Sequence, residues 1–173
     1  TGVQIAKDRI VEIYCIKILP DGKEEHLHQV LNPTIPIPPE VSKIHGIWDK
    51  DVADKPTFKA FSAELNAFLG DADFGGFNSN RFDFPMLAEE FYRAEIKFDT
   101  NRMFVDAQRI FHKMEPRNLG AAYKKYCSKD LVDAHSAKAD TIATWEVIKA
   151  QVDYYEELEN NIDFLHAFSG ESE

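Results

Sequence analysis

Hydrophobic positions near the start of the chain alternate with polar ones, which is the pattern of strands. Residues 8–19 are rich in β-branched and aromatic side chains, and residues 20–23, Pro-Asp-Gly-Lys, are a turn signal. Residues 24–31 alternate well enough to pair with the first strand as a hairpin. The sequence therefore predicts two antiparallel strands at the start of the chain.

After the proline-rich stretch 32–39, apolar residues recur mostly at helical spacing. A short helix is expected over 40–44, ended by Gly46, and short strands over 73–77 and 102–105. Longer helices are expected over 56–69 (capped by Thr57), 84–94, 107–113, 118–126 and 136–157. In the longest helix the expected buried face consists of Ile142, Trp145, Ile148 or Lys149, Val152 and Tyr155.

An antiparallel pair followed by alternating strands and helices predicts an α/β fold, with a mixed sheet flanked by helices. Ligands of such sheets gather at the carboxyl ends of strands, and Asn78 and Asp83 follow one such end. The length fits a single domain over residues 1–173, with an acidic tail from about residue 169. Because Thr1 runs directly into a strand-like segment, we expect this domain to be N-terminally incomplete.

Composition narrows the class of protein. A hydrophobic content of 44% supports a packed core. No segment approaches the ~20 apolar residues of a membrane span and no signal peptide is visible, so we expect a cytoplasmic protein without a membrane partner. The two cysteines, Cys15 and Cys127, are expected to be reduced. The formal net charge of −10 repels long polyanions, so any contact with nucleic acid must be local and assisted by metal ions.

Four polar residues carry the candidate chemistry. Taken singly, Asp83 is typical of a first-turn helix acid, Asn78 of a turn, His135 of a cap or surface histidine, and Asp140 of a solvated helix acid. The five-residue spacing from His135 to Asp140 allows both to face one site. A histidine base together with carboxylates that hold hard divalent cations is what hydrolysis of a phosphodiester needs. The set therefore indicates a nuclease.

The spacing of these residues also resembles a known family. Asn78-x-x-x-Phe82-Asp83 and His135-x-Ala137-x-x-Asp140 resemble the second and third motifs of the DEDDh 3′-5′ exonucleases, the DnaQ-like class of the DNA polymerase III epsilon proofreading subunit. Thr1-Gly2 looks like the end of the first motif of that family, and residues 8–13 look like its second strand. Residues 44–47 and 54–58 are similar to a loop of epsilon-like members, so the resemblance covers essentially the whole chain.

The resemblance implies an RNase H-like fold, two Mg²⁺ or Mn²⁺ ions, and release of nucleoside 5′-monophosphates from a 3′ end in proofreading or repair. It implies metal ligation by Asp83 and Asp140 and general-base catalysis by His135. The residues it assigns to substrate binding are Thr1, His45, Asn78 and Phe82. The implied partners are a single-stranded or frayed 3′ end, with DNA favoured over RNA, and a DNA polymerase.

One departure from the family bears on activity. The Asp and Glu of the first motif would precede Thr1, on a central strand that is not in the sequence, so we expect the chain alone to be inactive. An exposed apolar groove is expected beside the 8–19 strand, and Asp83, His135 and Asp140 are expected to converge on one acidic cleft. Two alternatives stay open: an RNA-trimming 3′-5′ exoribonuclease, and a non-catalytic RNase H-like module that binds nucleic-acid ends or a polymerase.

Overall fold

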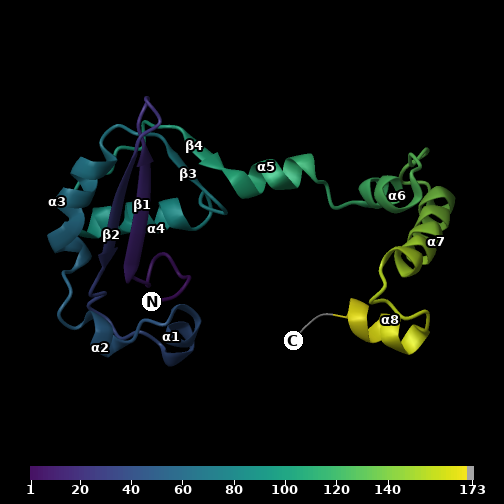
Figure 1. The fold of residues 1–173 in the computed structure, drawn as a ribbon, viewed down its shortest axis with the longest axis horizontal. Coiled ribbons are helices and arrows are strands. Elements are labelled where there is room, and N and C mark those ends of the chain that lie inside the picture. The colour runs from purple at the N-terminus through teal and green to yellow at the C-terminus, as the bar shows by residue number, and fades with distance from the viewer. Residues whose placement is uncertain (171–173) are drawn as a thin grey trace. The chain divides into compact units, whose positions relative to one another are not determined.

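The structure is a computed structural model that describes residues 1–170, and its residues cluster into two compact units. Unit 1 is Thr1–Ile110 and unit 2 is Phe111–Glu173. Figure 1 shows strands and helices in unit 1 and helices in unit 2. The expected single domain over 1–173 stays a prediction. No helix within residues 1–170 is long and apolar enough to cross a membrane.

Unit 1 opens with the predicted hairpin. Strand β1 (Glu12–Ile18) pairs antiparallel with β2 (Glu24–Val30), with Glu12 opposite Val30 and Ile18 opposite Glu24. Gly22 in the turn has φ of 86°, a left-handed conformation that glycine adopts without strain. Alternate residues of β1 face the two sides of the hairpin, so Ile13 and Cys15 pack on the core while Tyr14, Ile16 and Ile18 are exposed.

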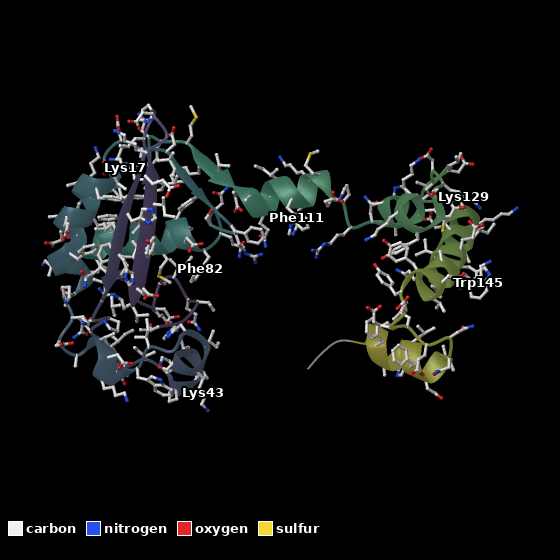
Figure 2. The ribbon with its side chains drawn as sticks, in the orientation of Figure 1. Lys17, Lys43, Phe82, Phe111, Lys129 and Trp145 are labelled. Atoms are coloured by element: carbon white, nitrogen blue, oxygen red, sulfur yellow. The ribbon has the colours of Figure 1, made fainter. Side chains whose placement is uncertain are left out.

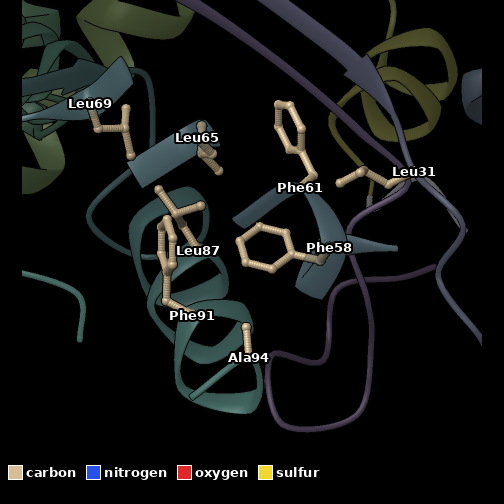
Figure 3. Packing of buried hydrophobic residues seen from close by; sticks show 8 residues of the cluster. All are labelled: Leu31, Phe58, Phe61, Leu65, Leu69, Leu87, Phe91 and Ala94. Atoms are coloured by element: carbon tan, nitrogen blue, oxygen red, sulfur yellow. The ribbon is translucent and has the colours of Figure 1, made fainter. Parts of the chain in front are cut away.

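The core of unit 1 forms where two amphipathic helices, α3 (Phe58–Leu69) and α4 (Asp83–Arg93), pack together and against the hairpin. The side chain of Thr57 caps α3 by accepting the Ala60 N–H at 3.2 Å, as predicted. Figure 3 shows the packed residues Leu31, Phe58, Phe61, Leu65, Leu69, Leu87, Phe91 and Ala94. The rings of Phe58 and Phe91 meet edge to face with centroids 5.1 Å apart. Two shorter helices, α1 (Pro39–His45) and α2 (Asp49–Val52), precede α3, and only the first was expected.

A second pair of strands lies beyond α3. Strand β3 (Phe74–Gly76) pairs in parallel with β4 (Phe104–Asp106), close to where strands were predicted. An antiparallel and a parallel pair flanked by helices confirm the mixed α/β class. Within residues 1–170, however, hydrogen bonds join neither β1 nor β2 to β3 or β4, so each sheet has two strands. The edge of β1 away from β2 is therefore open, as expected from the sequence.

Unit 2 is helical, and its boundary with unit 1, between Ile110 and Phe111, falls within α5 (Ala107–Met114). Helices α6 (Leu119–Cys127) and α7 (Ala137–Tyr154) pack against each other, and α8 (Ile162–Ser169) follows. Asn118 caps α6 as predicted, accepting the Ala121 N–H at 2.8 Å. The sequence did not predict α8, which ends at Ser169. The acidic tail expected from about residue 169 includes residues 171–173, which lie outside the described residues, and it stays a prediction.

Within unit 2, the predicted buried face of α7 is wrong over the first part of the helix, whereas Val152 and Tyr155 are half-buried. Ala143 and Val147 are buried, whereas Ile142, Trp145 and Ile148 are exposed, and Trp145 points away from α6 (Figure 2). The helix carries two apolar stripes, and the one with Ala143 and Val147 is buried in unit 2, where α7 packs against α6. The helix also ends at Tyr154 rather than 157. Tyr155 is extended, and its hydroxyl lies 2.6 Å from that of Tyr126.

Candidate functional site

A cavity of about 1420 Å³ in unit 1 lies between the open edges of β1 and β3. Four of the residues predicted from the sequence line this cavity: Thr1, His45, Phe82 and Asp83. They come from the N-terminal loop, the end of α1 and the start of α4. The fold of unit 1 therefore brings together residues that are up to 82 positions apart (83 − 1) in the sequence.

Hydrogen bonds hold Thr1 at the cavity wall. Its hydroxyl donates to Asp8 Oδ1 at 2.9 Å and accepts the Arg9 N–H at 3.0 Å, and only 6% of the residue is exposed. A Cβ on Gly2 would come within 2.5 Å of Asp8 Oδ2, so a side chain at this position would have to displace the Asp8 carboxylate. The loop is thus fixed through Asp8, with the side chain of one threonine as its anchor.

A buried ion cluster ties the same loop to α4. Glu90 is 1% exposed, and its Oε1 accepts from Arg9 Nε at 2.6 Å and from Arg93 Nη1 at 2.5 Å. Arg93 also donates to the carbonyl oxygens of Asp8 and Ile5, each at 3.0 Å. A carboxylate this buried is tolerated because both arginines neutralise it. The cluster fixes the N-terminal loop beside the helix that carries Asp83.

Asp83 is the first residue of α4, and its side chain is exposed at the cavity. The helix has no side-chain N-cap, because Phe82 occupies the capping position. An acid in the first turn is favoured by the helix dipole, so the structural role predicted for an isolated Asp83 applies here as well. Its carboxylate is nevertheless free to accept a cation from the cavity side.

Asn78 lies at the exit of β3 with φ of 56°, so it is a turn residue in a left-handed conformation. Its N–H donates to Asp106 Oδ1 at 2.9 Å, and it is not among the residues that line the cavity. His45 ends α1, and its Nδ1 accepts the Ile47 N–H at 3.1 Å. Substrate binding by Asn78 and His45 stays a prediction.

Sequence reasoning did not identify Asp106 as part of this region. The residue is 5% exposed, and both of its carboxylate oxygens accept backbone N–H groups: Oδ1 from Asn78 and Gln108, and Oδ2 from Asn80. Desolvation alone would raise the pKa of Asp106, but these hydrogen bonds together outweigh it and hold the pKa below its usual value. The only signal in the sequence is an acidic residue at the end of a strand.

His135 and Asp140 lie together in unit 2, where α7 begins. The His135 N–H donates to Asp140 Oδ1 at 3.3 Å, and Ser136 caps the helix through the Ala139 N–H. His135 has φ of 75°, which is rare for a residue with a side chain. Histidine is among the residue types that adopt this region most readily, and the nearby Asp133 has a positive φ as well. The imidazole is on an exposed residue, available to a ligand.

The structure does not test the predicted convergence of the three chemical residues, because Asp83 belongs to unit 1 while His135 and Asp140 belong to unit 2. Within residues 1–170, no group of three or more His, Cys, Asp or Glu side chains is placed to hold a metal ion. Carboxylate oxygens are ligands that Mg²⁺ and Mn²⁺ prefer, so the donor type fits these ions. The number of ligands gathered in one place does not yet suffice for a pair of ions.

Comparison with known proteins gives a consistent result. Residues 1–148 match the family RNase_T, described as "Exonuclease". The chain is 33% identical over 155 residues to the DNA polymerase III subunit epsilon of Rickettsia prowazekii, covering 82% of this chain and 65% of that protein. It is 23% identical over 174 residues to the DNA polymerase III PolC-type of Bacillus cereus, covering 94% of this chain and 12% of that protein. The chain thus spans about two thirds of the epsilon relative and much less of the other.

Solved exonuclease structures resemble the fold. Exonuclease I of E. coli in complex with a dT13 oligonucleotide matches with a TM-score of 0.57 at 20% identity, over 88% of this chain and 39% of that one. The zinc-bound form of the same enzyme with single-stranded DNA matches with a TM-score of 0.57 at 19% identity, over 90% and 38%. At this level of identity the likeness shows a shared fold, which is the predicted RNase H-like exonuclease fold.

Proposed function

Because the chain belongs to the RNase_T family of exonucleases, we propose that it hydrolyses DNA from the 3′ end, with divalent metal ions, and releases nucleoside 5′-monophosphates. The observation that carries the proposal is the gathering of Thr1, His45, Phe82 and Asp83 on one cavity. Relatives named DNA polymerase III subunit epsilon support DNA over RNA as the substrate, and a DNA polymerase as a partner. The proposed role is proofreading or repair.

In the proposed mechanism each residue of this chain has a separate task. His135 takes a proton from the attacking water, and its exposed position beside Asp140 supports that role. Asp83 and Asp140 would hold the metal ions. When bound, a pair of Mg²⁺ or Mn²⁺ ions would neutralise charge on the phosphodiester and lower the pKa of the water. The backbone of Thr1, with His45, Asn78 and Phe82, would position the terminal nucleotide.

Shared ions constrain where the two carboxylates lie. Each ligand oxygen has to come within about 2.0–2.6 Å of a cation, so Asp83 and Asp140 must approach the same site although 57 positions (140 − 83) separate them. A crystal structure with Mn²⁺ is expected to show both carboxylates on the ions. Carboxylates on opposite faces of the protein would exclude the assignment.

Two carboxylates are too few for two ions, and we propose that the remaining ones belong to a strand seated between β1 and β3. The open edges of both strands face that cavity. The Ser79 hydroxyl lines it, is buried, and has no hydrogen-bond partner within residues 1–170. A buried polar group without a partner costs about 1–3 kcal/mol, so a polar backbone in the cavity would be stabilising. A sheet with this strand in place would be continuous.

The test is digestion of an end-labelled single strand of DNA, and of RNA, with Mn²⁺ and with EDTA. Residues 1–173 alone should digest on the order of a thousandfold more slowly than a protein that includes the proposed strand with its carboxylates. In the longer protein, His135→Ala should cost on the order of a hundredfold in rate while Mn²⁺ binding persists. Asp140→Asn should instead weaken the binding of Mn²⁺.

Matched controls come from exposed residues of unit 2. His166→Ala in α8 and Asp153→Asn in α7 should leave digestion unchanged. A folded longer protein that shows no metal-dependent digestion of either nucleic acid, or a His135→Ala variant with full rate, would exclude the enzymatic role. A non-catalytic binding module would then be the better account. Faster digestion of RNA than of DNA would reassign the substrate.

A further inference from the structure

Asp106 is a buried carboxylate that accepts hydrogen bonds from two places. One is the turn after β3, and the other is the start of α5, the helix that directly follows Asp106 in the chain. It lies opposite Gly76 in the parallel register of β3 and β4, so it stands beside the exit of β3. Its two oxygens accept the N–H groups of Asn78 at 2.9 Å, Asn80 at 3.1 Å and Gln108 at 3.0 Å. A carboxylate with this burial is stable as an anion only because those donors replace water.

The turn from Asn78 to Phe82 depends on this carboxylate. Asn78 has a positive φ, and within the turn its N–H and that of Asn80 bond to Asp106 rather than to the backbone. A Cβ on Gly76 would come within 2.5 Å of the Ser79 Cβ, so the turn folds tightly back onto β3. The conformation is therefore held from one side by packing and from the other by Asp106.

The same turn leads into α4, which has no capping side chain of its own. Backbone bonds continue from the turn into the helix: the Phe82 N–H donates to the Asn78 oxygen at 3.2 Å, and the Phe84 N–H donates to the Ser79 oxygen at 2.9 Å. Asp83 stands between those two residues. Hydrogen bonds thus link Asp106 through Asn78 to Phe82, on one side of Asp83, while Phe84, on the other side, is bonded to Ser79, the chain neighbour of Asn78.

We infer that Asp106 is a positioning residue, which sets where Asp83 presents its carboxylate by clamping the turn in front of α4. This inference rests on the proposed role of Asp83 as a metal ligand. Asp106 does not touch the metal, and its effect passes through the backbone. Groups that orient metal ligands from a second layer change metal affinity by about ten- to a hundredfold when they are removed.

The experiment uses the longer protein, which includes the proposed strand, and compares wild type with Asp106→Asn. The substitution keeps the shape of the side chain but puts an N–H₂ donor against a backbone N–H. The backbone amides of Asn78 and Asn80 should exchange with solvent about tenfold faster or more. The Mn²⁺ concentration that half-broadens the Asp83 resonances, and the Mn²⁺ midpoint of digestion, should both rise by about tenfold to a hundredfold. The rate at saturating Mn²⁺ should stay within about twofold, because the chemical groups are intact.

Two internal controls separate positioning from a loss of fold. Asp99→Asn changes an exposed carboxylate whose Oδ1 accepts the Asn101 N–H at 2.8 Å, and it should leave the Mn²⁺ midpoint unchanged. The Phe74 N–H bonds to the Met103 oxygen at 2.9 Å without Asp106, so it should stay protected in every folded variant. If Asp106→Asn does not fold, Asp106→Glu keeps the charge, displaces both oxygens, and should raise the midpoint in the same way.

The outcomes are distinct from those that test the proposed function. Unchanged exchange at Asn78 and Asn80 overturns the clamp, and faster exchange with an unchanged Mn²⁺ midpoint overturns the positioning role, in both cases while digestion continues. A rate that stays low at saturating Mn²⁺ indicates a general structural defect and also overturns it. If Mn²⁺ broadens the Asp83 resonances of the wild type but the wild type digests no nucleic acid, only the proposed function is contradicted.

Discussion

Gly76 is the residue that allows the turn after β3 to fold back on the strand. A Cβ at this position would lie 2.5 Å from the Ser79 Cβ and 2.7 Å from its Oγ. Gly76→Ala should therefore force the turn to move and lower the free energy of unfolding by about 1–3 kcal/mol, measured by urea denaturation. Gly75→Ala is the matched control, because its nearest neighbour is the Val105 oxygen at 3.9 Å. Equal losses for both variants would contradict the packing argument.

The strained backbone of His135 separates its chemical role from its cost to stability. A residue with a side chain at φ of 75° pays roughly 1–2 kcal/mol that glycine does not. His135→Gly should therefore be more stable than His135→Ala by about 0.5–1 kcal/mol, while both lose the proposed general base. Thermal unfolding and single-strand digestion of the two variants provide the measurements. A glycine variant less stable than the alanine variant would show that the left-handed conformation is not kept in solution.

The residues proposed to do chemistry were readable from the sequence, whereas Asp106, which we infer positions one of them, was not. His135, Asp140 and Asp83 stand at motif spacings, and Thr1, His45, Phe82 and Asp83 do line one cavity. Asp106 bonds to backbone N–H groups, which every residue except proline carries. Such bonds leave no pairing pattern in the side chains, so only the fold reveals them.

Glu146 is the main polar link between elements of unit 2. On α7, it accepts a hydrogen bond from the Tyr123 hydroxyl of α6 and one from Lys129 Nζ at 2.9 Å. The hydrogen bond from Tyr123, followed by that from Lys129, lowers the pKa of Glu146 below its ordinary value of 4.5. The same contact with Glu146 raises the pKa of Tyr123 and of Lys129. These contacts make the packing of α6 on α7 dependent on pH.

The direction of that dependence follows from the lowered pKa of Glu146. A group with a folded pKa below its unfolded value stabilises the protein above the unfolded pKa, here 4.5, and the gain is lost as pH falls through the folded pKa. Wild type should therefore be more stable than Glu146→Gln at neutral pH, and the difference should shrink below about pH 4.5. Urea denaturation of both proteins from pH 7 to about pH 3 measures it. Asp153→Asn, on the same helix, should show no such convergence, and a constant gap for Glu146→Gln would contradict the linkage.

The spacing of apolar residues correctly predicted the buried face of helices with one apolar stripe. It failed where a helix has two apolar stripes. The apolar residues of α3 fall on a single stripe, and Phe58, Phe61, Leu65 and Leu69 are buried as expected. In α7 two stripes compete, and packing against α6 selects the one with Ala143 and Val147. The short α2 and the terminal α8 escaped prediction because segments of four to eight residues carry too few repeats to fix a period.

At the scale of the molecule, the two units have very different cores. Both clusters of buried hydrophobic residues lie in unit 1, whereas Ala143 and Val147 are the buried hydrophobic residues within 111–170. All of residues 111–118, which comprise the end of α5 and the loop before α6, are exposed. Exposed backbone with few packed contacts opens locally at low cost. Residues 111–118 are thus expected to be the most accessible segment within residues 1–170.

Limited proteolysis tests that expectation. Trypsin should cut first after Arg117, in the loop before α6, or after Lys113, where the exposed end of α5 can unwind into the extended backbone that a protease needs. The packed core of unit 1 denies such access. Mass spectrometry of the first products identifies the bond. Replacing both residues, Lys113→Gln with Arg117→Gln, should slow the first cut several-fold without changing the thermal midpoint. A first cut inside residues 1–110 would contradict the division of stability between the units.

The open edges of β1 and β3 also affect how the protein behaves in concentrated solution. Unpaired strand edges template pairing with whatever extended chain meets them, and here the exposed side chains of β1 include Tyr14, Ile16 and Ile18. Residues 1–173 without a strand in the cavity should therefore self-associate as concentration rises. A strand in the cavity would pair with β1 and β3, so neither edge would remain unpaired. Light scattering of a preparation would then show, before any assay of activity, whether the strand between β1 and β3 is in place.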